Sequence, residues 1–95
     1  WKLENLLFRM AEKALEEGKP KEASLALEDL ARGAGSRMVR ERANFLLAEI
    51  AEQTGDTEAA LRYYREVVHL SLGESGRLLE KAKERIERLE LRGKE

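Results

Sequence analysis

The sequence predicts an all-α fold: an α-solenoid of antiparallel helical hairpins, with five helices grouped as two repeats plus a C-terminal capping helix. The first observation is self-similarity, because a shift of 37 positions aligns identical residues over much of the chain. Repeats of this length are typical of stacked helical units. The second is apolar periodicity of three and four residues, without strand-like alternation. The shift aligns Glu4, Phe8, Ala11, Glu12, Ala14, Gly18 and Ala23 with Glu41, Phe45, Ala48, Glu49, Ala51, Gly55 and Ala60.

The first hairpin is predicted from the periodic apolar residues of a helix over 2–17. Gly18 ends this helix, because glycine takes the left-handed C-terminal conformation at little cost. Pro20 suits the first turn of a second helix, which stops in the segment 33–35. The apolar stripes comprise Leu3, Leu6, Leu7, Met10, Ala11, Ala14 and Leu15, then Ala23, Leu25, Ala26, Leu27, Leu30 and Ala31.

The second hairpin repeats this plan. Ser36 is expected to cap a third helix over about 37–54, and Gly55 ends it. Asp56 or Thr57 then caps a fourth helix. The apolar stripes comprise Val39, Ala43, Leu46, Leu47, Ile50 and Ala51, then Ala60, Leu61, Tyr64, Val67 and Val68.

The fifth helix is expected over about 77–91, after a break at the segment 73–76. Its apolar residues lie on one side, and lysine, arginine and glutamate cover the rest. This is the pattern of a capping helix, whose outer face meets solvent at the end of a stack. The apolar side comprises Leu78, Leu79, Ala82, Ile86 and Leu89.

Composition excludes several classes of function. The 18 basic and 19 acidic residues give a net charge of −1, so the sequence predicts no nucleic-acid partner. The chain has no cysteine, which excludes a thiolate zinc site and a cysteine nucleophile. No stretch approaches the roughly 18 consecutive apolar residues of a transmembrane helix. No cofactor is expected.

The residues do not predict an enzyme. His69 is the sole histidine, and with no second histidine or cysteine to share a metal it is expected to be structural or exposed. The many carboxylates are expected to form solvated helix faces rather than a catalytic pair. Glycines and arginines in the segment 32–37 could hold an anion at a helix N-terminus, but helix breaking explains them more simply.

The segment 55–67, Gly-Asp-Thr-Glu-Ala-Ala-Leu-Arg-Tyr-Tyr-Arg-Glu-Val, resembles the centre of a tetratricopeptide repeat, a helix–turn–helix unit of about 34 residues. Ala48 and Ala60 resemble the small residues of that family, and Tyr64 resembles its aromatic residue one turn later. Ala82 lies 34 residues after Ala48, which makes the fifth helix a third copy of the first. The resemblance implies a single domain over 1–95, with repeat 1 at about 3–35, repeat 2 at about 37–73 and the capping helix at about 76–92.

In tetratricopeptide proteins the concave groove lined by first helices holds a peptide, so the resemblance implies a non-catalytic scaffold that binds a protein or peptide there. Phe8 and Phe45 recur at one place in both copies, where an aromatic anchor with a charged rim suits peptide recognition. Glu12 and Glu49 favour a basic or apolar partner. The alternative is that both phenylalanines pack as core. The predicted partner-binding residues are Asn5, Phe8, Glu12, Arg42, Phe45, Glu49, Glu52, Leu79, Lys83 and Ile86.

Structural self-assembly is the alternative function. Apolar residues at the N-terminal end, Trp1, Leu3 and Leu6, could pair copies of the chain into a dimer or filament. The fifth helix offers a second apolar seam with coiled-coil-like spacing, although it lasts less than two heptads. That seam comprises Leu79, Ala82, Ile86 and Leu89.

Overall fold

The computed structural model describes residues 2–33, 35–71 and 76–93, which form five α-helices and no strand. Their bounds are α1 (Lys2–Glu16), α2 (Pro20–Gly33), α3 (Arg37–Gln53), α4 (Thr57–Leu70) and α5 (Arg77–Gly93). The predicted all-helical fold is therefore confirmed, with each helix within a few residues of its expected bounds. Trp1 and most of the predicted break at 73–76 lie outside the described residues.

The turns within the two hairpins form as the sequence predicts. Gly18 and Gly55 have φ values of 73° and 84°, the left-handed conformation in which a side chain would be strained. Pro20 is the first residue of α2. The Asp56 side chain accepts a hydrogen bond of 3.0 Å from the backbone N–H of Ala59, which caps α4. At the start of α3, Ser36 occupies the N-cap position without a side-chain capping bond.

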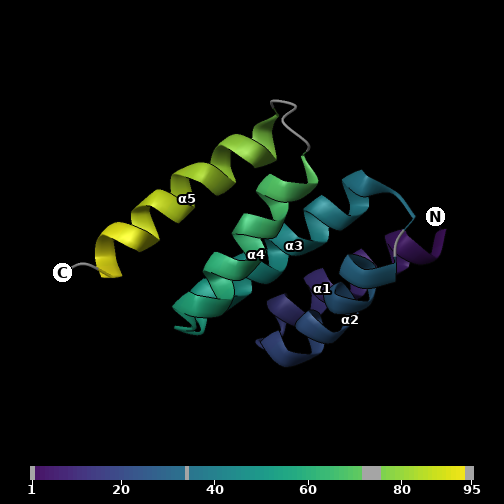
Figure 1. The fold of residues 1–95 in the computed structure, drawn as a ribbon. Helices are drawn as coiled ribbons and strands as arrows, with labels where there is room; N and C mark the ends of the chain where they lie inside the picture. Colours follow the sequence, from purple (N-terminus) through teal and green to yellow (C-terminus); the bar gives the residue numbers. More distant parts are fainter. Residues whose placement is uncertain (1, 34, 72–75, 94–95) are drawn as a thin grey trace.

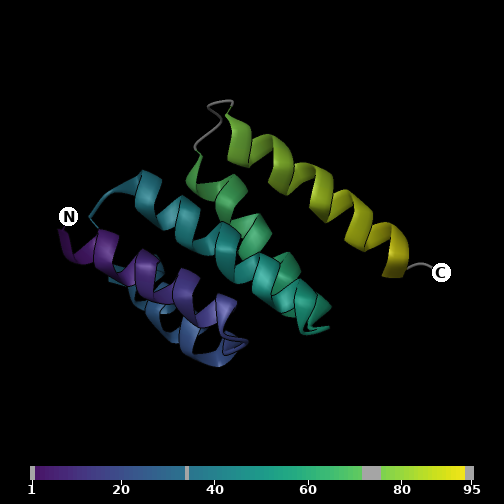
Figure 2. The same ribbon diagram turned by 180° about the vertical axis from the view of Figure 1, so that it is seen from behind.

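The helices pack in chain order. Each one lies against the next, and α3 also contacts α5. Figure 1 shows α2 and α4 in front of their partners, and Figure 2, seen from behind, shows α1 and α3 in front. The result is a helical-repeat-like arrangement in which the first helix of each hairpin lies in one layer and the second helix in the other. The two ends of the chain lie at opposite ends of the molecule (Figure 1).

Helix α3 contributes to both parts of the core. One side of it, including Ala43 and Leu47, packs with α1 and α2. The other side, including Phe45 and Ala48, packs with α4 and α5. Small residues allow the helices to approach closely, since Ala48 and its counterpart Ala82 on α5 are both fully buried. Burial at these two positions thus follows the repeat found in the sequence.

None of the helices in the described part of the chain combines the length and the apolar content that crossing a bilayer requires.

Candidate functional site

The ten predicted partner-binding residues lie on the first helices α1, α3 and α5, but they differ in exposure. The three that were expected to form an apolar stripe are buried, with Phe8 and Phe45 each 5% exposed and Leu79 6% exposed. These three side chains therefore belong to the core, as the alternative interpretation of the phenylalanines anticipated. Of the other seven, Glu49, Glu52 and Ile86 are half-buried, and Asn5, Glu12, Arg42 and Lys83 are exposed.

In the first hairpin, an arginine from the next first helix covers the phenylalanine. The Arg42 guanidinium lies 4.3 Å from the centre of the Phe8 ring, in position for a cation–π interaction. The same group forms an ion pair of 3.5 Å with Glu12, one turn after Phe8. Both charged side chains are more than half exposed, so this ion pair contributes little to stability.

A shallow hollow lies beside this arginine, between α1 and α3. We call it the first-helix hollow. Its volume is about 320 Å³, and three of the ten predicted residues line it. The exposed Met38 side chain adds apolar surface that the sequence analysis did not select. The lining comprises Glu4, Asn5, Phe8, Met38, Val39 and Arg42.

In the second hairpin, Arg85 of α5 takes the equivalent place. Its guanidinium lies 5.1 Å from the centre of the Phe45 ring and donates a hydrogen bond of 2.7 Å to Glu49. A second bond, of 3.0 Å, goes to the hydroxyl oxygen of Tyr64, whose ring meets Phe45 edge to face. This arginine is held by more partners than Arg42, and only about a quarter of its side chain is exposed.

The polar contacts continue from Tyr64 to Glu52 and Arg88. The Tyr64 hydroxyl donates a bond of 2.5 Å to one carboxylate oxygen of Glu52, and Arg88 donates a bond of 2.8 Å to the other. We call this chain of five residues, Glu49, Arg85, Tyr64, Glu52 and Arg88, the α3–α5 polar cluster.

Two pKa values shift in this cluster. Burial, followed by the hydrogen bond to Glu52, raises the pKa of Tyr64 to about 12 against the opposing effect of Arg85. The hydrogen bond from Arg85 to Tyr64 is the largest influence on the arginine, and together with Glu49 it raises the pKa of Arg85. The phenol is therefore neutral and the guanidinium charged at every physiological pH.

Two positions of the polar cluster differ between the two hairpins. Tyr64 and Glu52 lie 37 residues after Leu27 and Leu15, respectively. In the first hairpin these places carry apolar side chains, so Arg42 has Glu12 as its ion-pair partner but no hydroxyl equivalent to that of Tyr64. The polar cluster could have been anticipated from Tyr64 alone, because a buried phenol needs a hydrogen-bond partner. Its partners Arg85 and Arg88 were not selected from the sequence.

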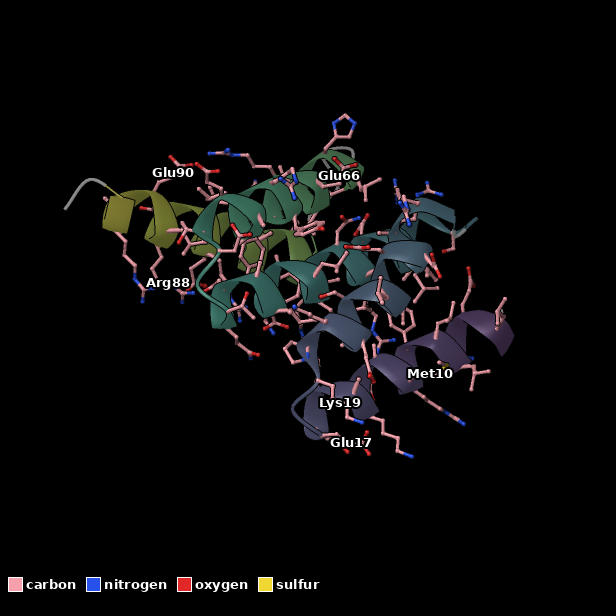
Figure 3. The ribbon with its side chains drawn as sticks, turned by 90° about the horizontal axis from the view of Figure 1, so that it is seen from below. Met10, Glu17, Lys19, Glu66, Arg88 and Glu90 are labelled. Atoms are coloured by element: carbon pink, nitrogen blue, oxygen red, sulfur yellow. The ribbon has the colours of Figure 1, made fainter. Side chains whose placement is uncertain are left out.

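Ion pairs hold α5 on two flanks. Arg88 reaches Glu52 of α3, and Glu90 reaches Arg65 of α4 at 3.4 Å. Figure 3 shows Arg88 and Glu90 on opposite sides of α5, with Met10 of α1 at the far end of the molecule. The apolar seam of α5 faces the core, with Leu79, Ala82 and Leu89 buried, so it is not a free surface.

Larger hollows lie on the other side of the molecule, between α2 and α4. One has a volume of about 570 Å³ and the other about 400 Å³, and Tyr63 borders both. Their walls mix apolar groups with charges of both signs, including Lys21, Glu28 and Arg62. None of the ten predicted residues lines either hollow.

The described residues hold no group of three or more histidine, aspartate or glutamate side chains placed to bind a metal ion. His69 is exposed near the end of α4.

Compared with known proteins, the chain matches no family model, and neither the curated proteins nor the solved structures contain a significant match.

Proposed function

We propose that this chain is a non-catalytic α-solenoid module of the tetratricopeptide-like kind, which binds a segment of a partner protein across its first helices. Two features support the proposal. Identical residues recur at 37-residue spacing, and each helix packs against its successor in two layers.

The first-helix hollow is the observation that carries this proposal. It lies between consecutive first helices, where the resemblance to tetratricopeptide repeats directs a bound segment. Asn5, Phe8 and Arg42, three residues selected from the sequence, line it together. Between α3 and α5, by contrast, the corresponding charged groups already bind one another in the α3–α5 polar cluster.

An apolar side chain is the best match for this hollow. Met38 and Val39 supply apolar walls, and Met38 is 74% exposed, so it is free to adjust to a ligand. Asn5 and Arg42 supply hydrogen-bond donors at the rim. Glu12 and Glu49 were expected to favour a basic or apolar partner, but both already form ion pairs with arginines of this chain. We therefore retain only the expectation of an apolar partner.

Selection from a random-peptide display library tests the proposal, with the Met38→Glu variant as the counter-selecting bait. We expect enriched peptides to share an apolar residue, to bind the parent chain and to lose at least about tenfold in affinity for Met38→Glu. Leu25→Glu is the matched control, because Leu25 is a similarly exposed apolar residue on α2.

Amide NMR shifts then locate the bound peptide on the parent chain. The largest shifts are expected at Asn5, Met38 and Arg42. Shifts confined to α2 and α4, or equal losses in both variants, would contradict binding in the first-helix hollow.

A further inference from the structure

One carboxylate at the first-helix hollow lacks a basic partner in the chain. Glu4 lies in the first turn of α1, where its half-buried side chain lines the hollow. It forms no ion pair with any lysine or arginine that the structure describes. Arg42 lines the same hollow, but its guanidinium pairs with Glu12. The Glu4 carboxylate is therefore available to a ligand that enters the hollow.

The internal repeat shows what a carboxylate at this position binds elsewhere in the molecule. Glu4 corresponds, 37 residues later, to Glu41 of α3. Glu41 forms an ion pair of 3.5 Å with Arg37, one helical turn earlier, and only 16% of the Glu41 side chain is exposed. A basic side chain supplied by a partner would give Glu4 the kind of contact that Glu41 has within the chain.

The charges around the hollow favour the same kind of group. Glu4 and Glu12 carry two negative charges against the one positive charge of Arg42, so one negative charge remains unbalanced. Nearby on α3, Arg37 pairs with Glu41, and neither that arginine nor Arg40 lines the hollow. An acidic side chain would meet Glu4 and would have to displace Glu12 from Arg42. Complementary charge of this kind selects among partners more than it raises affinity.

We infer that the first-helix hollow selects a partner segment in which a lysine or arginine adjoins the apolar residue, and that Glu4 receives the basic side chain. The inference rests on the proposed function, because it specifies the partner of the same hollow. Met38 and Val39 contact the apolar side chain and supply most of the affinity. A preference for basic partners, which the paired Glu12 and Glu49 do not support, thus has its basis in Glu4.

The preference is expected to be modest and to weaken with salt. An ion pair at a protein surface changes affinity by only about twofold to fivefold. Salt screens the attraction between the two charges but leaves the apolar contact in place. Binding of a basic peptide should therefore approach that of a neutral one as the salt concentration rises.

Two peptide display libraries test the preference on the 95-residue chain. Both carry a fixed leucine, which is flanked by lysine and arginine in one library and by aspartate and glutamate in the other. We expect enrichment from the basic library. In a synthetic peptide from the enriched pool, replacement of the flanking basic residue by glutamine should weaken binding about twofold to fivefold at low salt, and less at high salt. Amide NMR shifts at Asn5, Met38 and Arg42 identify the peptides that bind in the hollow.

The Glu4→Gln variant tests whether this carboxylate carries the preference. It should bind the basic and the glutamine-substituted peptide equally. Glu16→Gln is the matched control, because it removes the same charge from an exposed position of α1 outside the hollow, and it should keep the preference. The Glu4 charge also favours the start of α1, so circular dichroism should verify that each variant stays helical. The salt dependence of the parent chain needs no variant.

Four outcomes would overturn the inference while peptides still bind in the hollow: equal enrichment of the two libraries, enrichment of the acidic one, a preference that survives Glu4→Gln, or a preference that salt strengthens. Absence of binding in the hollow by peptides of either library would overturn the proposed function together with this inference.

Discussion

The two hairpins carry the same phenylalanine and glutamate four residues apart, yet they hold them differently. Around Phe8 the covering arginine is half exposed and lies beside a hollow. Around Phe45 it is held by Glu49 and Tyr64, and the neighbouring Glu52 is held by Tyr64 and Arg88. The Tyr64 hydroxyl, at the position that Leu27 occupies in the first hairpin, supplies the additional partner of Arg85.

A repeated pair of residues does not by itself make a repeated site. An arginine above an aromatic ring stays exposed where its ion-pair partner is itself an exposed carboxylate, as at Arg42. Where a buried phenol and a carboxylate both bind it, as at Arg85, it joins the helices of its own chain. The proposed binding site therefore lies in the first-helix hollow, whereas the α3–α5 polar cluster attaches α5 to the rest of the chain.

Removal of either phenylalanine ring is expected to have the largest effect on the free energy of unfolding. Phe45→Ala should lower the free energy of unfolding by about 3–5 kcal/mol, because Phe45 is buried and packs edge to face on Tyr64. Phe8→Ala should cost less, nearer about 3 kcal/mol, since its ring borders the first-helix hollow. Urea unfolding measures both losses. A greater loss for Phe8→Ala would reverse the contrast between the hairpins.

Tyr64 should titrate well above an ordinary tyrosine. Its pKa is raised to about 12 in the folded chain, against about 10 when unfolded, so its stabilising contribution is complete below about pH 10. That contribution is lost as the pH rises towards about 12. Phenolate absorbance of the Tyr63→Phe variant follows Tyr64 alone. A midpoint near 10 while the helices remain intact would show that the phenol is not held as described.

Removal of the Tyr64 hydroxyl should have a moderate effect. Tyr64→Phe keeps the ring but removes the donor to Glu52 and the acceptor for Arg85, so we expect a loss of about 1–2 kcal/mol in urea unfolding. Tyr63→Phe is the matched control and should change stability by less than about 0.5 kcal/mol. Similar losses for both variants would indicate that the hydroxyl network does not hold α5.

The smallest effect is expected at the outer flank of α5. Glu90 and Arg65 form an exposed ion pair, and Glu90→Gln should lower stability by less than about 0.5 kcal/mol. Thermal unfolding at low and high salt measures this change. A loss comparable with that of Tyr64→Phe would move the main attachment of α5 from the polar cluster to this ion pair.

Much of the fold could be predicted from the sequence, because local signals determine where these helices begin and end. Gly18, Gly55, Pro20 and Asp56 adopt the conformations or make the contacts that their residue types favour. Apolar spacing likewise identified most of the residues that pack in the core. Four members of the predicted stripes are nevertheless exposed, because no other element covers their side of the helix: Leu3, Leu6, Met10 and Leu25.

The site was harder to predict, because its contacts join helices distant in the sequence. Arg42 and Arg85 lie 34 and 40 residues after the phenylalanines that they cover, so no single repeat alignment pairs them. The periodicity that selected Phe8 and Phe45 is also the periodicity of a core, and burial decides between the two roles. Met38 lies before the identical residues that align the two repeats. Only the packing of α3 beside α1 places it in the first-helix hollow.

Parallel urea unfolding of Arg42→Met and Arg85→Met tests the central claim most directly, since both variants keep most of the aliphatic stem while removing the guanidinium. We expect a loss of about 1–3 kcal/mol for Arg85→Met, because Glu49 and Tyr64 lose their donor. For Arg42→Met we expect a loss of less than about 1 kcal/mol, because its exposed contacts stabilise little. Equal losses of stability, or a greater loss for Arg42→Met, would contradict the contrast between the exposed Arg42 and the enclosed Arg85.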